Sequence, residues 1–110
     1  MNRQIKHPLL ASPASIGSME LKNRMIMAAM GSNFASEDGC TTEKLIAYYE
    51  ERARGGIGLI ILETSAITWP AGASMPNMIG FSKDEFIPGL QSLTQRIHQH
   101  GSKIAAQLNH

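Results

Sequence analysis

The chain has 110 residues, of which 43% are hydrophobic and 17% are charged, and its formal net charge is +1. This length and composition fit one globular domain with a modest core. The near-neutral charge, with Lys and Arg scattered along the chain, predicts no nucleic-acid partner. A single cysteine, Cys40, excludes an internal disulfide and any multi-cysteine metal site within these residues.

The hydropathy pattern indicates neither a membrane span nor a secretion signal. No apolar run approaches the roughly 20 residues that a membrane-spanning helix needs. Near the N-terminus only Leu9–Ala11 forms an apolar stretch, which is too short for the core of a signal peptide. We therefore expect a cytoplasmic protein.

Residues 1–24 are predicted to form a turn-rich lead-in. Pro8 and Pro13 interrupt this stretch. A short β-hairpin can form around Gly17–Ser18, and its strands would contain Ile16, Met19 and Leu21.

Two apolar segments, Met25–Met30 and Leu59–Leu62, then predict buried strands, and Ile104–Leu108 predicts a third strand. A run without polar alternation is typical of a strand that is covered on both faces, as in a parallel sheet. The polar segment Ser32–Thr41, which follows the first run, is predicted to be a loop.

A helix is predicted between the first two strands. Thr41 or Thr42 can cap it, Glu43 suits its first turn, and Gly55–Gly56 ends it. Its apolar face is formed by Leu45, Ile46, Tyr49 and Ala53.

A second helix follows a long loop that runs from Ala66 to Gly80. Ser82–Glu85 has the spacing of a capping box, with Phe81 and Phe86 placed for a hydrophobic staple. Because proline is tolerated only in the first turn, Pro88 indicates a short turn followed by a longer helix that ends at Gly101. The inner face of this helix would contain Leu90, Leu93, Thr94 and Ile97.

The predicted order is β-α-β-α-β, which builds a parallel sheet with right-handed crossovers. Doubly wound sheets and (β/α)8 barrels both begin in this way. No Gly-x-Gly-x-x-Gly motif follows the first strand, and polar residues gather where the strands end, so the barrel is favoured. A whole barrel needs about 250 residues. We therefore predict an α/β fold in which residues 25–110 form the first three strands and two helices of an incomplete barrel.

Four segments together resemble the start of the old yellow enzyme family, the NADH:flavin oxidoreductases: Leu21–Met30, Tyr48–Ile61, Gly80–Glu85 and His98–His110. The resemblance implies a barrel that binds FMN at its C-terminal mouth. It further implies that NAD(P)H reduces the flavin, which passes hydride to an activated alkene such as an enone or enoyl thioester. The Ala-Ala-Met-Gly sequence of Ala28–Gly31 is similar to that of the larger members, such as 2,4-dienoyl-CoA reductase. Those members carry a 4Fe-4S cluster, whose ligands would lie beyond His110.

The resemblance also assigns residues to the flavin. Ala28, Ala29, Met30 and Gly31 match the loop that passes along the flavin ring, and Thr64 matches a position near the flavin N5 and O4. Gln107 matches a glutamine whose amide bonds the pyrimidine edge. Many members have Pro where Ala29 stands, and some have Cys or Thr where Gly31 stands, a side chain that modulates the flavin potential. No catalytic residue and no metal ligand is assigned within the chain.

Simpler roles compete with these assignments. Gln107 could close a layer of the barrel, Thr64 could bond to the backbone at a strand end, and Met30 could pack in the core. For Glu63, a structural salt bridge is favoured over a role beside the flavin site.

Three further side chains are expected to have no part in the site chemistry. His98 and His100 stand two residues apart on a helix and point in different directions, which argues against a metal pair. Trp69 is expected to pack locally within its loop.

Two hypotheses for function follow. In the first, the chain is part of an FMN-dependent oxidoreductase and is inactive alone, and copies of the chain associate through the open edge of the third strand. In the second, it is a non-catalytic scaffold or assembly module. Flavin absorbance in the purified protein would separate the two.

Overall fold

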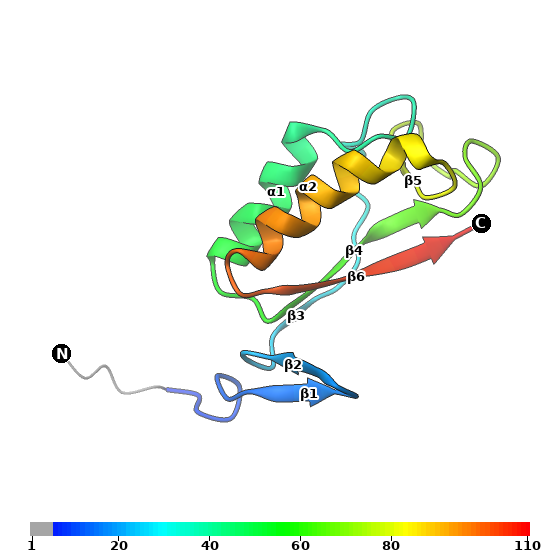
Figure 1. Cartoon of the computed structure of the whole chain (residues 1–110). Coiled ribbons are helices and arrows are strands. Elements are labelled where there is room, and N and C mark those ends of the chain that lie inside the picture. The colour runs from blue at the N-terminus through cyan, green and yellow to red at the C-terminus, as the bar shows by residue number, and fades with distance from the viewer. Residues whose placement is uncertain (1–5) are drawn as a thin grey trace.

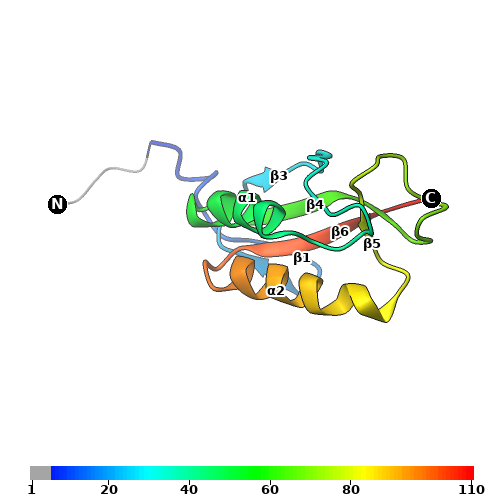
Figure 2. The ribbon, with the colours of Figure 1, turned by 90° about the horizontal axis from the view of Figure 1, so that it is seen from above.

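Two helices cover one face of a parallel sheet, and a small hairpin lies on the other side, in the computed structural model of the chain (Figure 1). The structure describes residues 6–110, so the first five residues of the predicted lead-in lie outside it. Seen from above, the two helices lie side by side along the strands (Figure 2). Neither of these helices is long and apolar enough to cross a lipid bilayer.

The predicted hairpin is confirmed. Strands β1 (Ala14–Ile16) and β2 (Met19–Leu21) pair antiparallel, and Gly17 in the turn has φ +57°. A positive φ is the conformation that glycine adopts without a steric penalty, which explains why the turn falls there. The hairpin is followed by Asn23, whose side-chain amide donates to the Gly56 carbonyl at 2.6 Å.

The central strand of the sheet is β4 (Leu59–Ala66), and every strand paired with it runs parallel to it. Strand β6 (Lys103–Asn109) pairs along its whole length. Strands β3 (Ile26–Met27) and β5 (Ile79–Gly80) pair with its beginning and its end. The predicted parallel order is therefore confirmed, as an open sheet and not as a closed barrel.

The strand predictions need three corrections. Strand β3 is shorter than the predicted Met25–Met30, because the chain leaves β4 after Met27. Met25, Ile26 and Met30 are 36% to 53% exposed, so the predicted burial of this segment on both faces is wrong. Strand β5 was not predicted and lies at the end of the predicted loop.

The first helix, α1 (Glu43–Arg54), begins as predicted. Thr42 is its N-cap residue, and its Oγ1 accepts a hydrogen bond from the Leu45 N–H at 3.1 Å. The helix ends at Gly55. All four predicted inward residues, Leu45, Ile46, Tyr49 and Ala53, are buried.

The second helix, α2 (Ile87–His98), follows a 3-10 turn over Asp84–Phe86, and Pro88 lies in its first turn as predicted. The predicted capping box is wrong, because the Ser82 hydroxyl instead accepts the Trp69 N–H at 2.9 Å. The core between the helices and β4 includes Leu93, Ile97 and Ile60, none of which is exposed.

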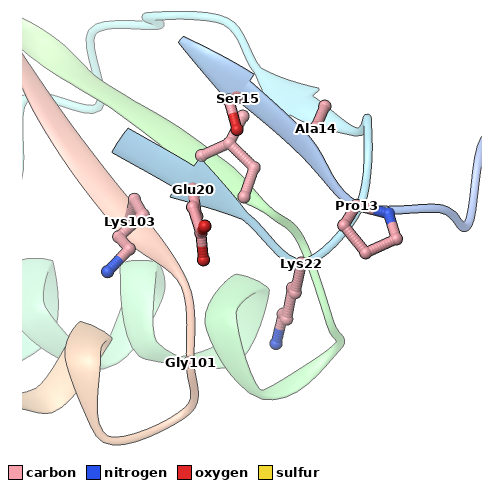
Figure 3. Close-up of a pocket in the computed structure, with 8 residues that line it drawn as sticks. Pro13, Ala14, Ser15, Glu20, Lys22, Gly101 and Lys103 are labelled. Carbon is pink, nitrogen blue, oxygen red and sulfur yellow. The ribbon is translucent and has the colours of Figure 1, made fainter. Parts of the chain in front are cut away.

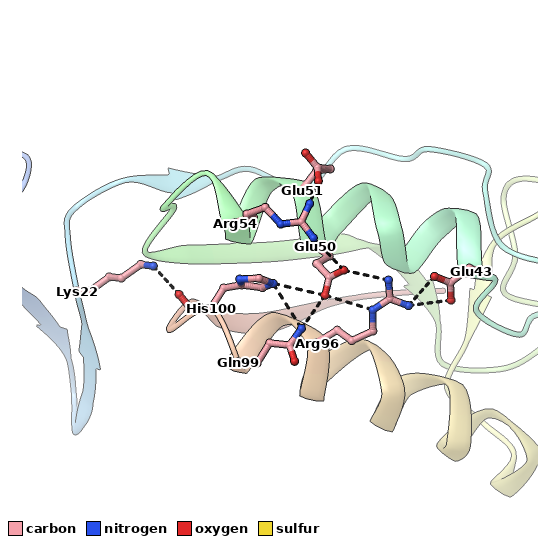
Figure 4. Close-up of polar contacts among 8 residues, drawn as sticks. All are labelled: Lys22, Glu43, Glu50, Glu51, Arg54, Arg96, Gln99 and His100. Carbon is pink, nitrogen blue, oxygen red and sulfur yellow. Dashed lines mark hydrogen bonds and ion pairs between the residues drawn. The ribbon is translucent and has the colours of Figure 1, made fainter.

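A polar cluster centred on the buried Glu50 joins α1 and α2, and its outer members, such as Glu43, are exposed (Figure 4). Arg96 donates to Glu50 at 3.0 Å and to Glu43 at 2.6 Å, and Gln99 donates to Glu50 at 2.9 Å. The hydrogen bond from Arg96 is the main reason that the pKa of Glu50 is lowered to about 2. Nearby, Lys22 donates to the His100 carbonyl at 2.8 Å and ties the end of the hairpin to the turn before β6.

We expect Glu50→Gln to flatten the acid dependence of stability. Folding lowers the pKa of Glu50 from an ordinary value of 4.5 to about 2, so its contribution is complete above pH 4.5 and is lost as the pH falls toward 2. In denaturant unfolding, the free energy of unfolding should fall more steeply with decreasing pH across this range for the parent chain than for the variant. The exposed Glu51→Gln is the control and should keep the parent slope; a parent slope for Glu50→Gln would contradict the prediction.

Candidate functional site

The residues assigned to the flavin lie where the parallel strands end. The segment Ala28–Gly31 follows β3, Thr64 lies near the end of β4, and Gln107 lies near the end of β6. Because parallel strands point the same way, their carboxyl ends share one edge of the sheet, which is where barrel enzymes place their chemistry. Thr64 and Gln107 are partners in the β4–β6 register. The structure therefore brings these two side chains together.

Thr64 and Gln107 face away from the helices. Ile60 and Ile104 pack against the helices and are also register partners, which defines the helix side of the sheet. The alternation of strand side chains then places Ala105 and Gln107 on the opposite face. A β-bulge between Leu62 and Thr64 keeps Thr64 on that same face.

This face offers free hydrogen-bonding groups that fit a flavin ring. The backbone N–H groups of Ala29, Met30 and Gly31 bond no other residue in the described part of the chain. The same holds, within residues 6–110, for the side chains of Thr64 and Gln107. A flavin's pyrimidine edge alternates donors and acceptors, and an amide supplies both. The small side chains of Ala28 and Ala29 and the lack of one at Gly31 leave the backbone approachable at these three positions.

Met75 occupies the space beside Gly31. A Cβ atom built on Gly31 would lie 2.8 Å from Met75 Cε and 3.2 Å from its sulfur. The loop that carries Met75 is held near this place by Asn77, whose N–H donates to the Asn33 side chain at 3.0 Å. Met75 was not predicted as part of the site, because nothing in the sequence pairs it with a residue 44 positions earlier.

Glu63 directly precedes Thr64 in β4, points to the helix side of the sheet and is fully buried. Its carboxylate accepts hydrogen bonds from the Tyr49 hydroxyl at 2.9 Å and the Ser32 hydroxyl at 2.6 Å. The predicted salt bridge is wrong, since no described Lys, Arg or His pairs with this carboxylate. Hydroxyl and amide donors hold the charge instead, as a buried ion requires.

Burial, and secondarily the charge of Glu63, raises the pKa of Tyr49 well above its usual range. Tyr49 therefore stays protonated at any physiological pH and remains a donor to Glu63.

The other chemically interesting side chains lie elsewhere. His100 contacts Glu50 at 3.4 Å in the polar cluster between the helices, and His98 is exposed. Trp69 does not pack only within its own loop as predicted, because its ring lies beside Gly39 of an earlier loop, where an added Cβ atom would be 2.9 Å from the ring. Burial raises the pKa of the Cys40 thiol, which disfavours the reactive thiolate. No three His, Cys, Asp or Glu residues gather into a metal-binding group among residues 6–110.

A groove lies at the opposite end of the strands, between the hairpin and the start of β6 (Figure 3). Its volume is about 480 Å³. Lys22 and Lys103 line it together with Glu20, and no residue assigned to the flavin does. Because it lies at the amino-terminal ends of the strands, the groove is separate from the candidate site.

The parallel strands, the covering helices and the candidate site at the carboxyl ends are the arrangement of the first strands of a (β/α)8 barrel. The sequence profile of the "NADH:flavin oxidoreductase / NADH oxidase family" matches residues 9–110. The chain belongs to this family.

Individual relatives agree with the family assignment. The chain is 39% identical over 103 residues to an NADH oxidase of Thermoanaerobacter brockii, covering 94% of the chain and 16% of that protein. It is 41% identical over 102 residues to an NADPH dehydrogenase of Bacillus subtilis (strain 168), covering 92% of the chain and 30% of that protein. The chain thus spans less than a third of these relatives.

Solved structures show the same fold. The old yellow enzyme of Trypanosoma cruzi superposes with a TM-score of 0.86 at 31% identity, covering 94% of the chain and 27% of that enzyme. The prediction of a partial TIM barrel is confirmed by this likeness.

We expect Gly31→Ala to be tolerated in folding. The added Cβ would meet the far end of the flexible Met75 side chain, which can turn aside, so the free energy of unfolding should change by less than about 1 kcal/mol. The control Gly58→Ala places its Cβ 2.7 Å from the Asn23 backbone oxygen, and we expect a loss of about 1–3 kcal/mol. Urea unfolding compares the two; equal losses would mean that Met75 is held rigidly against Gly31.

Proposed function

We propose that the chain is the N-terminal part of an FMN-dependent NAD(P)H oxidoreductase that reduces activated C=C bonds, such as those of enones or enoyl thioesters. The observation that carries the proposal is the row of unbonded donors and acceptors at the carboxyl ends of three parallel strands. It occurs in a chain of the NADH:flavin oxidoreductase family. Open hydrogen-bonding groups on this face suit a planar, polar-edged ring better than they suit a packed core.

The chain's own residues would hold one edge of the ring. The backbone of Ala29 and Met30 would lie along the isoalloxazine, Thr64 near N5 and O4, and the Gln107 amide at the pyrimidine edge. FMN, when bound, supplies hydride transfer between NAD(P)H and the substrate. Donors fixed at the pyrimidine edge stabilise the negative charge of the reduced ring, so their role is electrostatic.

The alkene and the nicotinamide are bound by groups outside this chain in our proposal. The family resemblance places the substrate-binding His pair, the proton-donating Tyr and the phosphate loops beyond residue 110. We therefore propose that the 110-residue chain alone is inactive. The Ala28–Gly31 sequence favours the larger members, in which a 4Fe-4S cluster would also be held outside these residues.

A fusion tests this function. Residues 1–110 would replace the matching segment of the Bacillus subtilis NADPH dehydrogenase, of which they cover 30%. We expect the purified fusion to be yellow, to retain FMN through purification, and to oxidise NADPH when 2-cyclohexenone is added. The chain alone should bind FMN only weakly, because it lacks the phosphate loops, and should not oxidise NADPH. Gln107→Leu should weaken FMN binding by up to about tenfold, the effect of one lost hydrogen bond.

The control is Gln91→Leu, which removes an exposed amide from α2, far from the strand ends, and should leave FMN binding unchanged. A folded fusion, checked by circular dichroism, that takes up no FMN would contradict the proposal. It would leave the alternative of a non-catalytic scaffold or assembly module.

We further propose that copies of the chain associate through β6. Its outer edge pairs with no strand in the described residues, and Leu108 on it is 63% exposed. An unpaired edge presents free N–H and C=O groups to another chain. Sedimentation equilibrium should show dimers or larger species of the isolated chain. Leu108→Lys should shift them toward monomers, and Ile87→Lys, at a residue 56% exposed on α2, should not. A stable parent monomer would contradict the proposal.

A further inference from the structure

We propose that Glu63 is a positioning residue for the flavin. Through Ser32, its buried carboxylate holds the Ala28–Gly31 loop in the shape that the ring requires. This inference rests on the proposed function and adds to it a residue that does not itself touch the ring.

The β-bulge in β4 places Glu63 for this role. Leu62 pairs with Ala106 and Thr64 pairs with Gln107, so Glu63 is the extra residue with no partner in β6. The bulge lets Glu63 point to the helix side, where it reaches Tyr49 of α1, while Thr64 stays on the flavin side. In a regular strand, side chains alternate between the two faces. With Leu62 in the helix-side core, Glu63 would then point to the flavin side and Thr64 to the helix side.

Ser32 is the link between this carboxylate and the loop. It follows Gly31 directly, and it donates to Glu63 twice, from its hydroxyl at 2.6 Å and from its backbone N–H at 3.3 Å. Its hydroxyl also accepts the Phe34 N–H at 3.2 Å, which fixes the direction in which the chain continues. The loop is thus anchored at one end by β3 and at the other by Ser32.

The loop needs such an anchor because it has no hydrogen bonds of its own. The N–H groups of Ala29, Met30 and Gly31 are free of bonds to other residues in the described chain, as a flavin-facing loop must be. Its shape is therefore imposed by its ends. On the Ser32 side the restraint is strong, because a fully buried carboxylate that lost its donors would pay a large desolvation cost.

Tyr49 completes the arrangement from the other side. Its hydroxyl donates to Glu63 at 2.9 Å and accepts the Glu63 N–H at 3.1 Å, so it fixes both the backbone and the carboxylate of this residue. Hydrogen bonds through Tyr49, Glu63 and Ser32 therefore connect helix α1 to the Ala28–Gly31 loop.

Ser32→Ala in the 110-residue chain tests the inference, since removing one hydroxyl at a half-buried position should leave the fold intact. Two quantities are measured by NMR. The first is the rate of amide hydrogen exchange at residues 29–33, without ligand. The second is the FMN dissociation constant, from amide shifts of the same residues during titration. We expect exchange to rise and FMN binding to weaken, each about tenfold, which is the effect of one lost charge-assisted hydrogen bond.

Matched variants separate positioning from general stability. Ser32→Thr keeps the hydroxyl and should restore parent values. Ser36→Ala removes a hydroxyl from the same polar loop, where it bonds Cys40, and should change neither quantity. Tyr49→Phe should resemble Ser32→Ala, while Tyr48→Phe, which alters the neighbouring ring on α1, should not. All are compared at a temperature where circular dichroism shows full folding.

The outcomes are distinct. If the parent chain binds FMN and Ser32→Ala binds it equally well, the positioning role is wrong and the proposed function stands. If the parent chain shows no amide shifts with FMN at millimolar concentration, the proposed flavin edge is wrong and this inference falls with it. If Ser32→Ala raises exchange without weakening FMN binding, the network only stabilises the fold, and the inference is likewise wrong.

Discussion

The structure depends on the parallel pairing of β4 with its neighbours. This strand is buried under both helices, and it is the one to which β3, β5 and β6 all bond. Its apolar residues Ile60 and Leu62 hold α1 and α2 in place, while its polar end carries Glu63 and Thr64. One strand thus supplies both the core and the site. The β4–β6 register that forms the core beneath the helices also places Thr64 beside Gln107.

A single β-bulge in β4 places Glu63 on the helix side of the sheet and Thr64 on the opposite face. Without it, side chains would alternate regularly after Leu62, so Glu63 would point away from the helices and Thr64 toward them. Family membership makes this division meaningful, because the face that receives Thr64 is the one on which we propose that the flavin lies. The other face receives a charge whose three donors come from only two residues, Ser32 and Tyr49.

Local patterns were enough to predict most of the fold. Some features depend only on a few neighbouring residues, and these were predicted: the helix cap at Thr42, the helix end at Gly55 and the hairpin turn at Gly17. Features that depend on distant residues were not. The capping hydroxyl of Ser82 is taken by Trp69, and β5 exists only because β4 is long enough to pair with it.

The candidate site shows the same division. The positions of Ala28 to Gly31, Thr64 and Gln107 at the strand ends followed from strand order and family resemblance. The donors of Glu63 could not be inferred from the sequence. An acidic residue in a buried strand needs a hydrogen-bonding partner, but the sequence does not show whether that partner is a cation or a hydroxyl. Met75 reaches the site from a loop, and loop paths are not encoded in any periodicity.

The contact between Gly31 and Met75 has a consequence for how these two positions can change. A side chain at position 31 and a long side chain at position 75 compete for the same volume, since a Cβ on Gly31 would lie 2.8 Å from Met75 Cε. For side chains larger than that of alanine, the two positions should therefore covary among relatives, with bulk at one matched by a smaller residue or a different loop path at the other. Anyone who places such a larger side chain at position 31 would need to redesign position 75 with it.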